Sequence, residues 1–235
     1  MERFAGRYAL LRLLGQGGMG TVHLALDLST GRECALKRLK PDLRASTPDA
    51  LRREFELLAR VRHPAVVGVL DLGFAPDGTT YYTMEYVPGV RADLGLPRGD
   101  WRALCFAAAE VAHGLEALHG AGVLHGDLKP SNLLVIPRAE GDGLPAGIRI
   151  LDFGLAALLD HAREGHRGTP GFAAPEVVRG ASPEVASDLF SLGATLYALA
   201  VGRPATPYSP PSSRSRARAN APPSAVALEI GRAHV

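Results

Sequence analysis

Residues 123–132 constrain this chain more than any other stretch, because they place three polar groups in a fixed order directly after an apolar helix. They read Val-Leu-His-Gly-Asp-Leu-Lys-Pro-Ser-Asn, with an acid at Asp127, a cation at Lys129 and an amide at Asn132. The carboxylate can accept a proton from an attacking hydroxyl, the ammonium can neutralise a moving phosphate, and the amide oxygen can hold a metal ion. The stretch therefore indicates phosphoryl transfer, with a plain polar loop as the alternative.

Composition narrows the class of protein. Of 235 residues, 46% are apolar and 21% are charged, which is typical of a globular chain. The net charge of +2 comes without a stripe of cations and gives no argument for a nucleic-acid partner. The N-terminus has no apolar export segment, Cys34 and Cys105 match neither a disulfide framework nor a zinc site, and the apolar run 189–201 is too short to span a bilayer. We expect a cytoplasmic protein without a membrane segment in this chain.

A glycine-rich hairpin lies near the N-terminus. Residues 15–22 read Gly-Gln-Gly-Gly-Met-Gly-Thr-Val between two predicted strands, so the tip is nearly free of side chains. Backbone amides at such a tip can approach phosphate oxygens closely, and Val22 can cover an apolar base. Many glycine-rich tips are simple turns, and a dinucleotide-binding fold requires a helix directly after the loop. Here a further strand follows Gly31 instead.

Lys37 lies on that further strand. Only three of the 26 basic residues are lysines, and in so arginine-rich a chain a lysine suggests a site that needs a compact ammonium. Strand alternation over residues 33–37 places Ala35 and Lys37 on the same side. A lysine under a glycine-rich flap can bind phosphate; an ordinary exposed strand lysine is the alternative.

A helix over residues 48–61 follows, with apolar residues at helical spacing. It carries Glu54, which we predict to pair with Lys37, and Glu56, which is the second choice. Two more strands complete a first lobe of five antiparallel strands and one helix, which ends at a connector over residues 85–89. These two strands are predicted over residues 66–72 and 80–84.

The rest of the chain predicts a second, mainly helical lobe. Residues 101–119 have apolar side chains three and four positions apart, as in a helix with one buried face. Short strands are predicted over residues 133–136 and 148–151. The second ends in Asp152-Phe153-Gly154, and an acid at such a strand end is placed to bind magnesium.

With these motifs the chain resembles the eukaryotic-type (Hanks-type) protein kinases, in particular the bacterial serine/threonine kinases, over residues 8 to about 203. The resemblance implies an α+β bilobal fold, with a five-stranded antiparallel N-lobe at 8–87 and an incomplete helical C-lobe at 88–203. It also implies ATP and Mg²⁺ as cofactors and transfer of the γ-phosphate to Ser or Thr hydroxyls of protein substrates.

The same resemblance implies a role for each matching residue. Asp127 orients the acceptor hydroxyl as base, Lys129 lies near the γ-phosphate, and Thr169 belongs to the acceptor-binding loop. Lys37 holds the α- and β-phosphates and is oriented by Glu54. The implied magnesium ligands are Asn132 and Asp152. The implied nucleotide-binding residues are Leu14, Gly15, Gly17, Gly20, Val22, Ala35, Lys37, Met84 as gatekeeper, Glu85 and Val87 in the hinge, and Leu134.

The chain departs from the family pattern at Gly126, where most members have an arginine that receives an activation-loop phosphate. Between Asp152 and Glu176 the only hydroxyl side chain is that of Thr169. We therefore hypothesise that activity does not require activation-loop phosphorylation.

A second departure lies at the end of the chain. Residues 187–201 resemble the buried central helix of the large lobe, with Asp188 bracing the catalytic loop. The family's further helices, and an arginine that pairs with the counterpart of Glu176, have no match after Arg203. Residues 204–235 are rich in Pro, Ser, Arg and Ala without periodicity, so we expect a disordered tail or an artefact of read-through from a gene fragment, with downstream domains missing.

Three other functions remain open. A nucleotide-binding pseudokinase scaffold is disfavoured because every catalytic residue is present, and a kinase of small molecules is disfavoured by the platform-like residues 168–176. An inactive truncated fragment is the third, because residues 189–201 would expose apolar surface without their covering helices. The four histidines at positions 113, 119, 161 and 166 have no metal-ligand partners at useful spacing and are predicted to be surface or packing residues.

Overall fold

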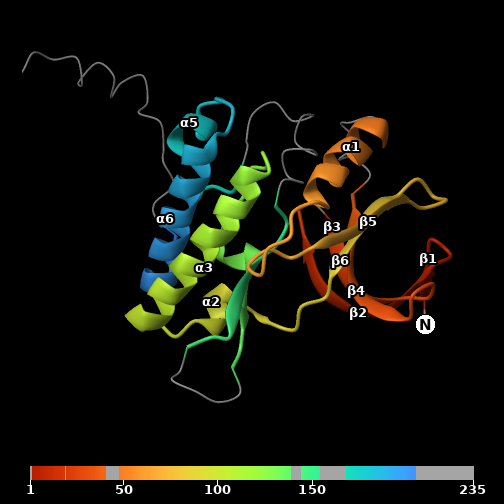
Figure 1. Ribbon diagram of the computed structural model, residues 1–235, viewed down its shortest axis with the longest axis horizontal. Coiled ribbons are helices and arrows are strands. Elements are labelled where there is room, and N and C mark those ends of the chain that lie inside the picture. The colour runs from red at the N-terminus through yellow and green to blue at the C-terminus, as the bar shows by residue number, and fades with distance from the viewer. Residues whose placement is uncertain (1, 19, 41–47, 139–143, 154–167, 205–235) are drawn as a thin grey trace, which may run out of the picture.

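The computed structural model describes residues 2–18, 20–40, 48–138, 144–153 and 168–204, except for the side chains at positions 48, 50 and 54. A curled sheet and the helix α1 form one side of the molecule, and the longer helices α3 and α6 form the other (Figure 1). The predicted tail beyond residue 204 and the whole segment between Phe153 and Gly168, which includes His161 and His166, lie outside the described residues.

The first lobe is an antiparallel sheet of six strands, one more than predicted. The additional strand lies at the N-terminus, where Glu2 pairs with Leu10 and Phe4 pairs with Tyr8. Three residues are too few for a readable alternation, so pairing with a neighbour, rather than local pattern, creates this strand. In spatial order the strands are β1 (Glu2–Phe4), β2 (Tyr8–Gly17), β3 (Gly20–Asp27), β4 (Arg32–Leu39), β6 (Thr80–Glu85) and β5 (Val69–Phe74).

Helix α1 (Pro48–Leu58) packs against this sheet through Leu51, Phe55 and Leu58, which are buried at helical spacing. It ends three residues before the predicted boundary at Val61, although Val61 is itself buried in the same cluster. Apolar periodicity identified the buried face correctly, while the end of the helix depended on where the chain turns back toward the sheet.

Two antiparallel helices form the body of the second lobe. Helix α3 (Trp101–Gly120) begins at Asp100, whose side chain accepts hydrogen bonds from the backbone amides of Arg102 and Ala103. Helix α6 (Val185–Val201) lies against α3 (Figure 1) and ends at Gly202, which has φ of +77°. The shorter helices are α2 (Ala92–Gly95), α5 (Pro175–Val178) and the 3₁₀ turn η2 (Pro130–Asn132).

Helix α6 also has exposed apolar side chains. Leu189 is 53% exposed, and Phe190 and Tyr197 are exposed to similar extents. Glu176 on α5 accepts a hydrogen bond from Ser187 at the start of α6, at 2.8 Å. The family resemblance implies that an arginine pairs with the counterpart of Glu176. In this structure Ser187 donates a hydrogen bond to Glu176.

A second, three-stranded sheet connects the lobes and positions the site. Its order is β7 (Val90–Arg91), β8 (Leu133–Ile136) and β9 (Gly147–Ile150). The Ile150 amide donates to the carbonyl of Ala65, and the Ile150 carbonyl accepts from Val67, so the chain between α1 and β5 is fixed to β9. One buried apolar cluster runs continuously from the first lobe into the second. Among the described residues no helix is long and apolar enough to cross a membrane.

Candidate active site

Asp127, the acid of the loop 123–132, is held by two neighbours. Lys129 Nζ lies 2.6 Å from Asp127 Oδ2, and the Thr169 hydroxyl donates to Asp127 Oδ1 at 2.6 Å. Lys129 Nζ also donates to Thr169 Oγ1 at 2.7 Å, which closes a triangle of three side chains. Asp127 is buried, and this triangle fixes its carboxylate from both oxygens.

Asp188 fixes the backbone of the same loop from below. Its carboxylate accepts hydrogen bonds from the amides of His125 at 2.8 Å and Gly126 at 2.9 Å. The side chain of His119 on α3 makes a third contact with it at 2.9 Å. Asp188 is 1% exposed, and it satisfies the buried amide of His125 and the partly buried amide of Gly126. The bracing role predicted for Asp188 is therefore confirmed, whereas His119 is a partner of Asp188 rather than a mere surface or packing residue.

His125 connects the loop to the strand that carries Asp152. Its Nε2 lies 3.1 Å from the carbonyl oxygen of Leu151, and its Nδ1 lies 3.2 Å from the amide nitrogen of Asp127. A carbonyl can only accept and an amide N–H can only donate, so the ring is the neutral tautomer with its proton on Nε2. Burial lowers the pKa of His125 below its ordinary value, in agreement with a neutral ring.

The two implied magnesium ligands are brought together by sheet pairing. Leu133 pairs with Ile150, and the Leu151 amide donates to the Asn132 carbonyl at 2.8 Å, which places Asn132 beside the residues that lead into Asp152. The Asn132 side-chain nitrogen donates to the Asp127 carbonyl at 2.9 Å, so its side-chain oxygen remains available as a ligand. One carboxylate and one amide fit Mg²⁺, which usually binds few protein ligands together with substrate phosphates. The described residues contain no cluster of three or more His, Cys, Asp or Glu that could hold a metal alone.

Asp152 has an unusual backbone and two strong partners. Its φ of +55° is rare for a residue with a side chain. Lys37 Nζ donates to Asp152 Oδ2 at 2.6 Å, and the Tyr82 hydroxyl donates to Oδ1 at 2.8 Å. Burial opposes the charged carboxylate, but Lys37 and then Tyr82 outweigh it, so the pKa of Asp152 lies below its ordinary value. Asp152 is therefore an ionised carboxylate with both oxygens engaged.

Lys37 is buried and contacts Asp152 as an ion pair across the two lobes. The side chain of Glu54 lies outside the described residues, so its pairing with Lys37 stays a prediction. Glu56, the second choice, is exposed on α1.

The glycine-rich hairpin joins β2 to β3. A Cβ added at Gly15 or Gly17 would meet nothing within 4 Å, so the space beside these glycines is open for a ligand. Gly20 is different, because an added Cβ would lie 1.9 Å from the carbonyl oxygen of Arg38 on β4. Packing against the neighbouring strand therefore explains this glycine without reference to a ligand.

Most residues of the predicted base pocket meet around one apolar cluster. Ala35 and Met84 are buried in it and face each other across β4 and β6, and Leu14, Val22 and Val87 are partly buried against it. Two further residues stand apart from this cluster. Leu134 is partly buried on β8, and the exposed Glu85 uses its backbone amide to donate to Gly68.

Sequence reasoning missed Tyr82 and the partnership of His119. Tyr82 lies in a strand of apolar and aromatic residues and looks like core, and only its register opposite Lys37 reveals its role. His119 lies six residues before His125, at the end of a helix, and a contact with Asp188 on α6 is set by packing of two helices.

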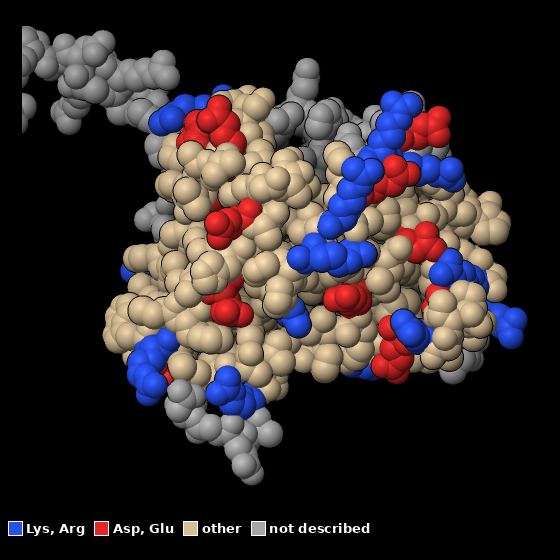
Figure 2. All heavy atoms as spheres, viewed as in Figure 1, with Lys and Arg blue, Asp and Glu red and all other residues tan. Residues whose placement is uncertain are grey.

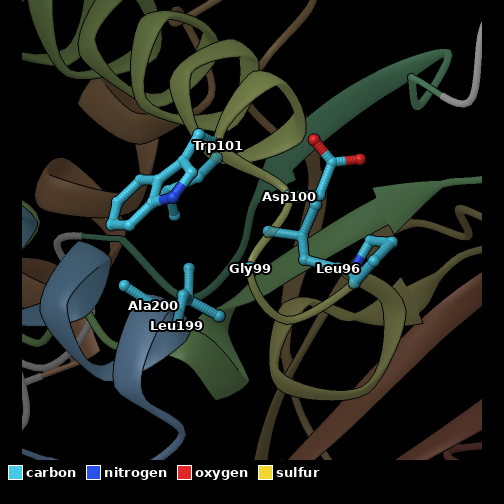
Figure 3. A pocket seen from close by; sticks show the side chains of 8 residues that line it. Leu96, Gly99, Asp100, Trp101, Leu199 and Ala200 are labelled. Atoms are coloured by element: carbon cyan, nitrogen blue, oxygen red, sulfur yellow. The ribbon is translucent and has the colours of Figure 1, made fainter.

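A small pocket lies elsewhere, between the loop that precedes α3 and the last turn of α6 (Figure 3). Leu96 and Trp101 line one side, and Leu199 and Ala200 line the other. It contains none of the predicted site residues. Figure 2 shows acidic and basic side chains interspersed on the face viewed, with many uncharged residues over α3 and α6.

Comparison with known proteins adds independent information. The family model described as the protein kinase domain matches residues 8–226. The DNA damage-responsive serine/threonine-protein kinase RqkA of Deinococcus radiodurans is 41% identical over 210 residues, which are 85% of this chain and 30% of that protein. The serine/threonine-protein kinase pkn3 of Myxococcus xanthus is 35% identical over 86% of this chain and 39% of its own length.

A solved structure agrees in fold. The PknI kinase domain of Mycobacterium tuberculosis superposes with a TM-score of 0.68 at 31% identity, over 90% of this chain and 80% of that one. The chain thus spans well under half of the two curated relatives and most of this solved domain.

Proposed function

The chain belongs to the family of the protein kinase domain, and we propose that it is an ATP-dependent serine/threonine kinase whose acceptors are hydroxyls of proteins. The observation that carries the proposal is the triangle of Asp127, Lys129 and Thr169, built beside Asn132 and Asp152. The names of the bacterial relatives support the same reaction.

Asp127 is the group that receives the acceptor hydroxyl. Its Oδ1 accepts from Thr169 and its Oδ2 from Lys129, so an acceptor hydroxyl can use the remaining lone pairs or take the place of Thr169. The carboxylate orients the hydroxyl oxygen toward the γ-phosphorus and takes up its proton as the new O–P bond forms, while the bond from the γ-phosphorus to the β,γ-bridging oxygen breaks and ADP leaves. Lys129 supplies positive charge beside the phosphoryl group while it keeps its bond to Thr169.

Lys37, Asn132 and Asp152 would hold ATP with its magnesium. The open space at Gly15 and Gly17 fits the approach of phosphate oxygens, and the oxygens of Asn132 and Asp152 fit a hard cation. Bound Mg²⁺ neutralises charge on the β- and γ-phosphates. Lys37 lies next to Asp152 and is placed to hold the α- and β-phosphates from the other side.

Gly126 gives this catalytic loop its own character. It has φ of +77°, a conformation that glycine adopts without strain. An arginine at this position would be a cation that a phosphorylated activation loop could bind. With Gly126 in its place, the loop 123–132 has no such cation at this position. We propose that the kinase is active without such phosphorylation. Treatment with a phosphatase should leave the rate unchanged, and a large fall would contradict this part of the proposal.

We further propose the boundaries 8–87 and 88–203 for the two lobes, a cytoplasmic location, a signalling role and additional domains in the complete protein. The last point is supported by the small share of the relatives' length that this chain spans.

The test of the proposed function combines binding and transfer on the 235-residue chain. Thermal unfolding is followed with and without Mg²⁺ and ATP, and transfer from labelled ATP to myelin basic protein is measured for the wild type, Lys37→Met and Asp127→Asn. We expect Mg²⁺-ATP to raise the unfolding temperature of the wild type, and less so that of Lys37→Met. Asp127→Asn should keep the binding shift and lose at least about a hundredfold in rate.

Other outcomes select the alternatives. Binding of Mg²⁺-ATP without transfer in the wild type would favour a pseudokinase scaffold. Absence of a cooperative unfolding transition would favour an inactive fragment, in keeping with the exposed Leu189 and Phe190.

A further inference from the structure

Tyr82 is a buried tyrosine whose hydroxyl contacts a carboxylate, so it does more than fill apolar space. It is 1% exposed in the middle of β6, and its hydroxyl donates to Asp152 Oδ1 at 2.8 Å. A phenylalanine would fill the same apolar space without placing a polar atom there. The hydroxyl therefore has a use other than packing.

Strand register places Tyr82 and Lys37 together. Lys37 on β4 pairs directly with Tyr82 on β6, and directly opposed residues of an antiparallel pair lie on the same face of a sheet. Lys37 Nζ is 5.7 Å from the centre of the Tyr82 ring, and each side chain donates to a different oxygen of Asp152. Two adjacent strands of the first lobe thus hold one carboxylate of the second lobe at two points.

The orientation of Asp152 needs such support. Its φ of +55° is sparsely populated for a non-glycine residue, and a residue persists there when its surroundings fix it. One hydrogen bond to a carboxylate leaves rotation about that bond, whereas bonds to both oxygens fix the plane of the group. The Tyr82 hydroxyl is the donor of this bond, because an ionised carboxylate has no proton to give.

We propose that Tyr82 is a positioning residue of the nucleotide site, which fixes the carboxylate of Asp152 through Oδ1 so that its remaining lone pairs point toward the magnesium ion. This inference rests on the assignment of Asp152 to magnesium in the proposed function. Each oxygen has a second lone pair, so Tyr82 and Lys37 orient the ligand without excluding the cation.

The neighbouring Tyr81 provides a matched control. It is also buried, at 8% exposed, but strand alternation turns it to the opposite side of the sheet, where it belongs to a separate apolar cluster with Phe4 and Tyr8. The variants Tyr82→Phe and Tyr81→Phe each remove a single hydroxyl from the same strand.

The experiment measures binding, not turnover. The fluorescent nucleotide mant-ATP is titrated into the 235-residue chain without metal, and Mg²⁺ is then titrated at fixed nucleotide. For Tyr82→Phe we expect the Mg²⁺ concentration at half-saturation to rise about tenfold, with unchanged affinity for metal-free nucleotide. Tyr81→Phe should match the wild type in both titrations. Tyr82→Leu, a second variant without the ring, should show a shift at least as large as that of Tyr82→Phe.

The outcomes separate this inference from the proposed function. If Asp152→Asn abolishes the Mg²⁺ effect while Tyr82→Phe titrates like the wild type, the role of Tyr82 is overturned and the kinase assignment stands. A loss of metal-free nucleotide binding equal to the loss of Mg²⁺ binding in Tyr82→Phe would mean a packing role and would also overturn it. If Asp152→Asn leaves the Mg²⁺ titration unchanged, Asp152 is not a magnesium ligand. The proposed role of Tyr82 is then overturned together with that assignment.

Discussion

Replacement of Asp188 by alanine should destabilise the fold strongly although the residue lies outside the proposed chemistry. Its carboxylate accepts from the amides of His125 and Gly126 and contacts His119, all within 2.9 Å. Alanine removes two hydrogen bonds to a carboxylate, at about 1.5–3 kcal/mol each, and leaves the buried His125 amide and the partly buried Gly126 amide without this partner. Removal of a desolvated carboxylate offsets part of this cost.

We therefore expect Asp188→Ala to lower the free energy of unfolding by about 4 kcal/mol. With a urea dependence of about 2 kcal/mol/M, the midpoint of unfolding should fall by about 2 M. Asp188→Asn keeps one acceptor oxygen for the loop and should lie between the wild type and the alanine variant. The measurement is urea unfolding followed by far-UV circular dichroism.

The matched control is Asp93→Ala. Asp93 forms a two-bond ion pair with Arg91, but both side chains are exposed, and exposed pairs contribute about 0–1 kcal/mol. If Asp188→Ala loses no more stability than Asp93→Ala, the loop amides have found other partners and the reasoning from burial is wrong.

Three further predictions follow from individual contacts. Burial lowers the pKa of His125, so below about pH 6.5 the unfolded chain binds a proton that the folded chain does not bind. The free energy of unfolding should therefore fall as the pH is lowered from 7 to 5.5, and it should fall less steeply in His125→Asn. The same pH dependence in His125→Asn as in the wild type would contradict this prediction. Gly20→Ala should lower the free energy of unfolding in urea by about 3 kcal/mol, because the added Cβ would clash with the Arg38 carbonyl. Gly18 lies in open space, so Gly18→Ala should leave the free energy of unfolding nearly unchanged. Equal effects of the two substitutions would refute the clash. Thr169→Val should lower kcat about tenfold without changing ATP affinity, since Asp127 loses one hydrogen-bond donor. An unchanged kcat in steady-state assays would show that Thr169 is not part of the site.

Local sequence chemistry was sufficient to predict the residues of the proposed reaction. Asp127, Lys129 and Asn132 lie within six positions, so their relative placement depends mainly on one short loop. The hairpin glycines are visible in the sequence as well, but only the structure separates Gly20, which packs against Arg38, from Gly15 and Gly17, which have open space beside them. The buried face of α1 followed from helical periodicity. In α3 the apolar residues at helical spacing are buried at Val111, Leu115 and Leu118 but exposed at Trp101, Cys105 and Ala112, so periodicity located this face only in part.

Partnerships between distant residues were harder to predict. The short strand β1 forms only by pairing with β2, and His119 differs from an ordinary helix-end histidine only through Asp188 on another helix. The sequence also identified Lys37 without its observed partner, since Asp152 lies 115 residues away.

The sequence by itself determined the chemistry that we propose, because catalytic groups must be particular residue types at particular spacings in a loop. Tertiary structure decided how those groups are held. The register of β4 against β6 places Tyr82 beside Lys37, and the packing of α6 against α3 brings Asp188 to His119 and the loop amides. Such contacts depend on the relative position of elements far apart in the chain. The type of a single residue does not indicate which distant residue will contact it after folding.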